Sequence, residues 1–459
     1  MVTYAEHVRG SAHTRRHAGA CWNVRAIAAA VVVAGVLLAA GAANAAPKMV
    51  KGPYLQDLAP NSITVMWQLD EQVPGKLIVE GPGGKRELDV PADRIVEARV
   101  DNLEPSSRYR YRVVVGDATW DGEFATAPPV GKDVPFSFIV VGDSRDGIEQ
   151  HRRVVERMSQ EVPDFILGTG DMVDEGFRQD QWQQFFDVEN ATLRDNVYFP
   201  ALGNHDRQGN GRTADTYRSY FSVPENGGET ERYYAFTYAA ARFLVLDSNE
   251  YSFALTDQTA WLERELASAR DDTAIKHIFV VMHHPPFSIS LHGGALDLRE
   301  RWTPLFEKYQ VTCVFSGHDH VYERAEHNGL RYFVTGGGGA PLYPRRPHPN
   351  PIDVEAVKKF ERTLHYLRVN VTGNHIEVTA IRADGTTIES QAWTDGPNET
   401  PAPGTTVASV PGAGAPSMSP APVAAAPAGE TKRSVGWFVA GGILIALGAA
   451  VVVVRTMRQ

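Results

Sequence analysis

Short clusters of carboxylate, amide and imidazole side chains recur along the middle of the chain, most of them directly after glycine. The clusters are Gly142-Asp143, Gly170-Asp171, Gly203-Asn204-His205, His283 and Gly317-His318-Asp319-His320. A single aspartate after a glycine more often caps a turn than binds a ligand. Five clusters in succession are not explained by turns. Oxygen donors combined with several neutral imidazoles are the ligands of iron, manganese and zinc, so we expect a metal centre.

The candidate ligands are numerous enough for two divalent or trivalent metal ions. Two ions about 3.5–4 Å apart share an anionic ligand and keep positions open for water and a phosphate group. We expect Asp171 to be the bridging ligand. The other expected ligands are Asp143 and His320 for the first ion, and Asn204, His283 and His318 for the second.

Each cluster follows an apolar segment with the length and composition of a buried strand. These segments are residues 136–141, 165–167, 198–202, 278–281 and 311–315, with helical patterns such as 148–161 and 258–270 between them. Alternating strands and helices predict an α/β domain, and such domains gather their ligands at the carboxyl ends of the strands. Residues 366–393 return to β alternation, with a hairpin turn at Asp384-Gly385.

Residues 47–128 show short alternating runs separated by Pro and Gly turns. Runs such as 63–67 and 109–113 predict a small antiparallel β-sandwich. The spacing of Leu103, Pro105 and Tyr109 resembles the corner of a fibronectin type III module. The region holds no candidate catalytic cluster, so we expect a structural or docking role for it.

The two ends of the chain have the composition of export and anchoring segments. Residues 1–46 contain several arginines, an apolar run and an Ala-x-Ala site at Ala43-Asn44-Ala45, which predicts a signal peptide. Residues 394–434 are rich in Pro and Ala and predict a linker, and residues 435–454 are apolar enough for a transmembrane helix. We therefore expect an exported, extracytoplasmic protein, periplasmic or on the cell surface, held in the membrane by a single C-terminal helix.

The overall charge narrows the class of partner. The formal net charge is −10, without a long basic stripe, which argues against a nucleic acid and leaves a small phosphorylated molecule as the expected substrate. The chain has two cysteines, of which Cys21 lies in the predicted signal peptide. Cys313 alone cannot form an internal disulfide, so we expect stability to come from core packing.

The order of the five clusters resembles that of the calcineurin-like metallophosphoesterases, and further details resemble their purple acid phosphatase branch. These details are Gly52-Pro53-Tyr54-Leu55, the helix with Gln258, Trp261, Leu262 and Glu263, residues 317–324, and the glycine-rich residues 336–339. The resemblance extends over roughly residues 51–393. It implies a four-layer α/β/β/α metallophosphoesterase domain at residues 134–393, preceded by the fibronectin type III-like sandwich. It also implies hydrolysis of phosphate esters by water that two metal ions activate.

Two positions depart from this family pattern. Purple acid phosphatases have a tyrosine three positions after the bridging aspartate, whose phenolate binds ferric iron and gives the colour, and this chain has Asp174 there. The wider superfamily often has a histidine two positions after the first aspartate, and this chain has Arg145. We therefore expect a protein that is not purple, in which Asp174 is the candidate fourth ligand of the first ion.

Three further residues are candidates for contact with the substrate. By resemblance, His205 faces the substrate and hydrogen-bonds a phosphate oxygen or protonates the leaving group. His292 lies nine positions after His283, where the purple enzymes carry a substrate-facing histidine. Arg145 binds a phosphate oxygen if it points inward, and is otherwise an ordinary loop residue. We favour His283 over the adjacent His284 as the metal ligand.

The sequence leaves the exact activity open. A phosphomonoesterase of the acid phosphatase type is the first hypothesis. A phosphodiesterase or nucleotidase of the same superfamily is the alternative among enzymes, because the clusters define water activation and not the groups around the ester. A catalytically weakened surface binding protein is the alternative from another class, since two expected ligands are replaced.

Overall fold

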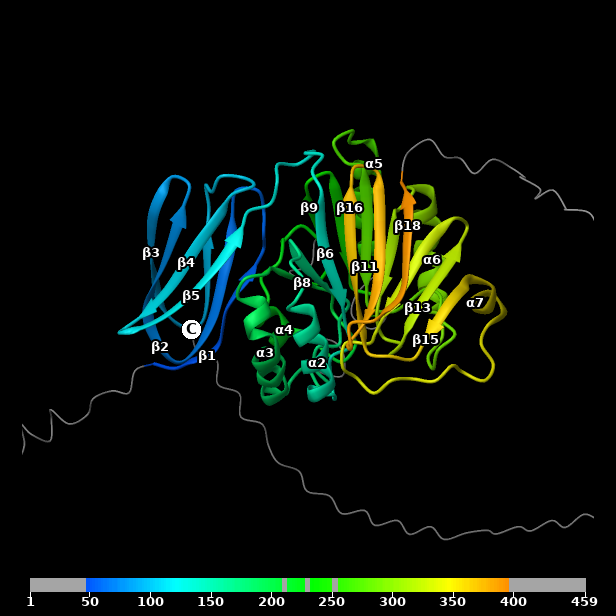
Figure 1. Cartoon of the computed structure of the whole chain (residues 1–459), viewed down its shortest axis with the longest axis horizontal. Coiled ribbons are helices and arrows are strands. Elements are labelled where there is room, and N and C mark those ends of the chain that lie inside the picture. The colour runs from blue at the N-terminus through cyan, green and yellow to red at the C-terminus, as the bar shows by residue number, and fades with distance from the viewer. Residues whose placement is uncertain (1–46, 209–212, 228–231, 250–254, 396–459) are drawn as a thin grey trace, which may run out of the picture. The chain divides into compact units, whose positions relative to one another are not determined.

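The computed structural model describes residues 47–208, 213–227, 232–249 and 255–395. The predicted signal peptide therefore lies outside the described residues, as do all but the first two residues of the predicted linker. The described elements fall into an N-terminal antiparallel sheet and two larger sheets with helices around them (Figure 1).

The N-terminal region forms a five-stranded antiparallel sheet. Its strands are β1 (Met49–Gln56), β2 (Ile63–Gly81), β3 (Gly84–Val100), β4 (Arg108–Val115) and β5 (Ala118–Ala125). In β4 the residues alternate between exposed and buried, with Tyr109, Tyr111 and Val113 buried, as expected for a strand with one face on a core. The described strands of this region form one sheet, and both the β-sandwich at residues 47–128 and its fibronectin type III assignment stay predictions.

A six-stranded sheet carries the first half of the candidate site. Its strands lie in the order β18 (Thr387–Thr394), β17 (His375–Arg382), β16 (His365–Thr372), β6 (Phe136–Val141), β7 (Phe165–Gly168) and β8 (Tyr198–Pro200). Strands β6, β7 and β8 are parallel, so their carboxyl ends meet at one edge of the sheet. The accompanying helices are α2 (Ile148–Met158), α3 (Gln179–Leu193) and α4 (Asp215–Tyr220).

A seven-stranded sheet carries the second half. Its order is β15 (Val357–Glu361), β13 (Tyr322–His327), β14 (Leu330–Thr335), β12 (Cys313–Ser316), β11 (His277–Met282), β10 (Ala241–Leu246) and β9 (Tyr234–Tyr238). Its helices are α5 (Leu255–Asp271), α6 (Leu296–Lys308) and α7 (Pro351–Ala356). Strands β10, β11, β12 and β14 are parallel, which gathers the loops after β11 and β12 at one edge.

The two large sheets face each other across a core of phenylalanine rings. The ring of Phe138 in β6 stacks on Phe165 at 5.2 Å and meets Phe243 of the other sheet edge-on at 5.4 Å. The outer faces pack against helices, through residues such as Trp182 of α3 and Trp302 of α6. This arrangement confirms the predicted mixed α/β fold, with the two sheets inside and helices on both outer faces.

The N-terminal sheet is joined to the region around α3 and α4 by specific polar contacts. The Tyr54 hydroxyl donates to the backbone oxygen of Tyr220 at 2.8 Å, and the Tyr111 hydroxyl donates to that of Arg194 at 2.7 Å. Lys51 donates to Gln183 Oε1 at 3.0 Å. Buried hydroxyls with partners of this kind fix one orientation of packed elements, which suits a structural role for this sheet.

The prediction of a membrane anchor requires correction. Among the described residues no helix is both long and apolar enough to cross a bilayer. A spanning helix needs about 20 apolar residues, whereas α5 has 17 residues and includes charged ones. The expected transmembrane helix at residues 435–454 lies outside the described residues, and the membrane partner and the anchored location that depended on it are not supported.

Candidate metal centre

Three of the candidate ligands have an unusual backbone conformation. Asp143, Asp171 and His318 have φ angles of 59°, 56° and 67°. These values lie in the left-handed region, which is uncommon for residues other than glycine and persists where the surroundings fix it. All three residues follow strand ends, after β6, β7 and β12 respectively. The His318 amide donates to both carboxylate oxygens of Asp143 at 3.0 Å. These hydrogen bonds link the turn after β12 to the turn after β6.

The ligands predicted for the second ion converge on one point. Asn204 Oδ1 lies 3.0 Å from both His283 Nε2 and His318 Nδ1, and these two nitrogens are 3.2 Å apart. Asp171 Oδ1 is 3.4 Å from His283 Nε2. Nitrogen and oxygen atoms packed this closely need a proton or a cation between them, because lone pairs repel each other.

The histidine predicted for the first ion has a nitrogen without a hydrogen-bond partner. His320 Nδ1 lies 2.8 Å from the backbone oxygen of Pro341, which accepts only, so Nδ1 carries the proton. His320 Nε2 then offers a lone pair, 3.5 Å from Asp143 Oδ1. It is buried and has no hydrogen-bond partner among the described residues. A buried polar atom left in this way calls for an explanation, and a metal ion provides it.

A backbone contact of the same kind orients His283. Its Nδ1 lies 2.8 Å from the backbone oxygen of Thr169, which directs Nε2 toward the other ligands. Histidines that bind metals usually donate their second ring nitrogen to a backbone carbonyl or a carboxylate. Both His283 and His320 do so, and this supports the fit of the donor set to metal ions.

Burial and neighbouring charges set the protonation of these groups. Burial raises the pKa of Asp143 well above its usual range. Burial also opposes ionisation of Asp171, but the charges of His283 and Arg145 prevail and lower its pKa. Burial lowers the pKa of His320 to about 4, which keeps this imidazole neutral, as a metal ligand must be. For His283 the charge of Asp171 outweighs burial and raises the pKa to about 9 in the metal-free protein.

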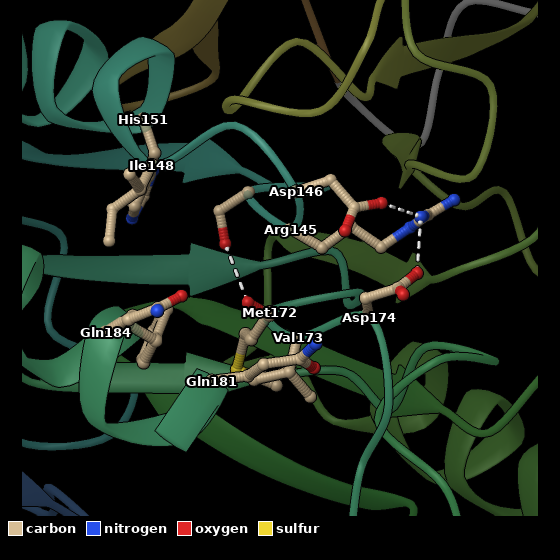
Figure 2. Close-up of a pocket in the computed structure, with 11 residues that line it drawn as sticks. Arg145, Asp146, Ile148, His151, Met172, Val173, Asp174, Gln181 and Gln184 are labelled. Atoms are coloured by element: carbon tan, nitrogen blue, oxygen red, sulfur yellow. Dashed lines mark hydrogen bonds and ion pairs between the residues drawn. The ribbon is translucent and has the colours of Figure 1, made fainter. Parts of the chain in front are cut away.

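Arg145 points into the site. Its side chain is only 10% exposed, and its Nε lies 3.3 Å from Asp171 Oδ2. Its Nη1 lies 2.9 Å from Asp174 Oδ1 (Figure 2). The inward orientation excludes an exposed loop position, whereas contact with a phosphate oxygen stays a prediction. The two positions that depart from the family pattern thus form an ion pair with each other. A ligand role for Asp174 stays a prediction, and it requires this carboxylate to loosen its contact with Arg145.

The other two predicted substrate contacts also lie at the site. The His205 amide donates to Asp171 Oδ1 at 2.9 Å, and its ring Nδ1 lies 2.7 Å from the backbone oxygen of Asp174. The His292 ring lies beside that of His318, with 4.4 Å between centroids. The His292 amide donates to Asp319 Oδ1 at 3.0 Å. The structure therefore brings every predicted site residue together, and their individual roles remain predictions.

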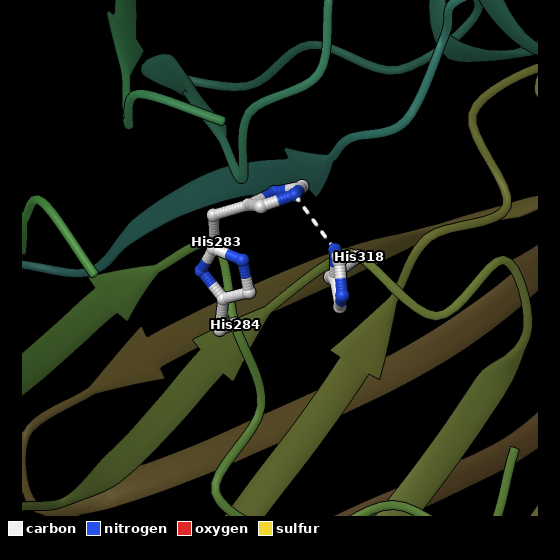
Figure 3. Close-up of side chains that lie close together, drawn as sticks. All are labelled: His283, His284 and His318. Atoms are coloured by element: carbon white, nitrogen blue, oxygen red, sulfur yellow. Dashed lines mark hydrogen bonds between the residues drawn. The ribbon is translucent and has the colours of Figure 1, made fainter. Parts of the chain in front are cut away.

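His284 is a close neighbour that the sequence left as the weaker candidate. Figure 3 shows its ring below His283 and beside His318. The three residues offer nitrogens that all lie within 4.8 Å of one another. The Ser248 hydroxyl accepts the His284 amide at 2.9 Å and lies 2.8 Å from its Nδ1. This hydrogen bond occupies Nδ1 of His284, whereas the ring of His283 is turned toward Asn204 and Asp171.

Two residues with clear roles in shaping the site were missed by the sequence analysis. The buried Asp206 carboxylate accepts the amides of Asp171 at 2.9 Å, Met172 at 2.8 Å and Gly203 at 2.8 Å. It therefore joins the loops after β7 and β8. The only sequence signal for it is its place directly after Asn204-His205.

Tyr343 is the second missed residue. Its ring stacks on His320 with centroids 3.9 Å apart and planes at 16°, and its hydroxyl lies 3.4 Å from Arg145 Nη2. It follows the glycine-rich residues 336–339 at a short distance in the chain. An isolated tyrosine in a loop has no pattern that predicts such a contact.

Several known proteins are similar to this chain in sequence or in fold. Residues 136–322 match the family model of calcineurin-like phosphoesterases. The chain is 30% identical over 344 residues to an uncharacterized protein of Mycobacterium tuberculosis, covering 67% of this chain and 64% of the relative. It is 28% identical over 264 residues to a purple acid phosphatase of Glycine max, covering 53% and 55%. It is 24% identical over 309 residues to an Fe(3+)-Zn(2+) purple acid phosphatase of Arabidopsis thaliana, covering 63% and 65%.

The chain spans less than two thirds of the length of these curated relatives. Among solved structures, the purple acid phosphatase PPD1 from yellow lupin (Lupinus luteus) seeds has a TM-score of 0.61 at 17% identity, covering 76% of this chain and 74% of that one. PhoD has a TM-score of 0.58 at 16% identity, covering 76% and 90%. At these identities the structural likeness describes the fold alone.

Proposed function

We propose that this chain, a calcineurin-like phosphoesterase of the metallophosphoesterase superfamily with purple acid phosphatase-like relatives, is a metal-dependent hydrolase of small phosphate monoesters. One observation carries the proposal. Side chains from the ends of β6, β7, β8, β11 and β12 meet with polar atoms 3.0–3.5 Å apart around two points that a cation would satisfy. Turns alone do not require such convergence.

The donor set suits two ions, with Asp171 between them. Asp143 and His320 would hold the first ion, and Asn204, His283 and His318 the second. Mixed carboxylate, amide and imidazole ligands fit iron, manganese or zinc. When bound, such ions supply Lewis-acid stabilisation of phosphoryl oxygens and lower the pKa of water.

The chain's own residues supply positioning and proton transfer. His205 Nδ1 is held by the backbone oxygen of Asp174, so its other ring nitrogen is the one that contacts a phosphate oxygen or protonates the leaving oxygen. Its side chain is 31% exposed, so a substrate can reach it. The Arg145 guanidinium is held in place by three carboxylates and presents a fixed positive charge at the site. His292, beside His318, is the remaining candidate contact with the substrate.

Metal analysis combined with a substrate panel tests the proposal. We expect close to two metal ions per chain, together with release of phosphate from p-nitrophenyl phosphate. Bis(p-nitrophenyl) phosphate and nucleotides complete the panel, and faster turnover of either would favour the diesterase or nucleotidase alternative. A folded, metal-supplemented protein that binds no cation and hydrolyses none of these esters would overturn the proposal and favour a binding protein.

A further inference from the structure

A cavity lies next to the metal centre, between helices α2 and α3. Its volume is about 250 Å³. Ile148 and His151 line it from α2, and Gln184 lines it from α3 (Figure 2). Phe185 of α3 is a further lining residue. None of these residues belongs to the predicted ligand set. Its size suits one ring-sized group rather than a whole large ligand.

The cavity adjoins the candidate reaction centre through the loop after β7. Met172 and Val173, which line it, directly follow the bridging candidate Asp171. Their amides donate to the buried Asp206 carboxylate at 2.8 Å and 3.3 Å, which fixes this wall relative to the metal ligands. Arg145 and Asp174 also line the cavity and belong to the site. A group attached to a phosphate at the metal centre therefore needs only a short linkage to enter it.

One part of the cavity wall is apolar, formed by Ile148, Met172, Val173 and Phe185, and the remaining lining residues are polar. Met172, Val173 and Phe185 are each at most 5% exposed. The His151 ring lies nearly parallel to that of Phe185, at 9° and 6.0 Å. His151 Nδ1 lies 2.8 Å from the Gly338 oxygen, and Nε2 lies 3.3 Å from Glu189 Oε1 without forming a hydrogen bond. A wall that combines an apolar part with uncharged polar groups such as Gln181 and Gln184 suits an uncharged ring.

The charges at the cavity exclude a second anionic group. Arg145 is the one arginine or lysine among the residues that line it, and its Nη1 is already paired with Asp146 at 2.6 Å and Asp174 at 2.9 Å. The two negative charges of these carboxylates outnumber the single positive charge of the guanidinium. An anionic substituent placed there would lose its hydration and meet repulsion without an unpaired cation in return.

We infer that this cavity is the leaving-group subsite and that it receives an uncharged aromatic ring, so that the enzyme prefers phosphate monoesters of aromatic alcohols or phenols over esters that carry a second anionic group. The inference rests on the proposed function. In the reaction the ester P–O bond breaks, water supplies the oxygen that bonds to phosphorus, and the alcohol leaves with a proton. No oxidant or further reactant is needed.

A tryptophan at the mouth of the cavity tests the subsite. Gln184 is exposed on α3, so Gln184→Trp fills the opening without disturbing the core. Asn190→Trp places the same side chain at an exposed position of the same helix away from the cavity, and serves as the matched control. The readout is kcat/KM for benzyl phosphate divided by kcat/KM for ethyl phosphate, two alcohol esters that differ by the ring. Melting temperatures of both variants are compared with the wild type.

We expect Gln184→Trp to lower this ratio at least tenfold, mainly through a higher KM for benzyl phosphate, and Asn190→Trp to leave it within twofold. The wild-type enzyme should also hydrolyse 4-carboxybenzyl phosphate at least tenfold less efficiently than benzyl phosphate. Adenosine monophosphate, assayed in parallel, shows whether a nucleobase uses the same cavity.

A ratio that is unchanged in Gln184→Trp, or lowered equally in Asn190→Trp, would overturn the subsite while leaving the hydrolase intact. Equal efficiency for the carboxylated and plain benzyl esters would overturn the charge argument. If the wild type hydrolysed none of the esters with iron, manganese or zinc present, the proposed function itself would fall, and the subsite with it.

Discussion

The two sides of the candidate metal centre are built differently. On the second-ion side, Asn204 Oδ1 and the nearest nitrogens of His283 and His318 lie within 3.2 Å of one another. On the first-ion side, His320 Nε2 and Asp143 Oδ1 are 3.5 Å apart, and the two remaining positions form the Arg145–Asp174 ion pair. Both sides place their ligands at strand ends, yet their donor atoms differ in spacing and in available charge. We expect the second-ion side to bind metal more tightly.

Removing the shared ligand should have the largest effect, because it belongs to both sides. Asp171→Asn is expected to lose bound metal and to lower kcat/KM by about 1,000-fold or more, the upper end of what one electrostatic contact contributes. Elemental analysis and phosphate release measure the two losses. Asp89→Asn, at an exposed position of the N-terminal sheet, is the control. Two ions per chain and full activity in Asp171→Asn would contradict the bridging role.

His205 belongs to neither ligand set, so its removal should separate chemistry from metal binding. His205→Ala is expected to retain the metal content of the wild type and to lose about 100-fold in kcat, the lower end for a general acid. The measurement is steady-state kinetics on a sample whose metal content is known. Turnover of a phosphate ester at the wild-type rate would show that His205 is not the proton donor.

The colour of the iron-loaded protein tests the effect of a carboxylate at position 174 on the first-ion side. The wild type has a carboxylate where the purple enzymes have a phenolate, and should show no strong visible band. Asp174→Tyr would restore the phenol next to the first-ion side and is expected to produce such a band. Asp174→Phe has the same ring without the oxygen and should stay colourless. A purple wild type, or identical spectra for the Tyr and Phe variants, would contradict this reading.

The smallest expected effect is a difference in proton release between the two sides. In the metal-free protein the pKa of His283 is raised to about 9, since Asp171 outweighs burial, so this ring is protonated at pH 7. Burial lowers the pKa of His320 to about 4, so that ring is already neutral. Binding at the second-ion side should therefore release a proton and strengthen as the pH rises toward 9. At the first-ion side His320 should release none, and any proton released there should come from Asp143, whose pKa burial raises.

Calorimetry in buffers with different ionisation enthalpies measures these protons directly. His283→Ala should abolish the release associated with the second-ion side. His375→Ala, on an exposed strand position, is the control. Proton release that persists unchanged in His283→Ala would place the titrating group elsewhere.

The strands next to the site could be predicted from the sequence because they are apolar and short. The segment 278–281 corresponds to β11 (His277–Met282), and 165–167 to β7 (Phe165–Gly168). Buried parallel strands carry this signal within themselves. Strand β15 (Val357–Glu361) contains two lysines and a glutamate and pairs only at the edge of its sheet, so its composition gives no such signal.

The chemistry of the candidate site was predictable where it depends on residue type, and not where it depends on contacts distant in the chain. Ligand types and order identified Asp171 and His283. The orientation of Arg145 depends on Asp174, 29 positions away, and on Tyr343, 198 positions away. Neither partner belongs to a local pattern that includes Arg145. The membrane anchor shows the opposite error, in which a local pattern was extended to a location that the described structure does not support.

The placement of the ligands on separate sheets has a mechanical consequence. Asp143 and Asn204 follow strands of the six-stranded sheet, whereas His283, His318 and His320 follow strands of the seven-stranded sheet. Each ion would therefore link the two sheets at the edge of the phenylalanine core. The melting temperature of the whole domain would rise with the occupancy of the metal centre. A chelator would therefore lower the melting temperature as well as stop the reaction.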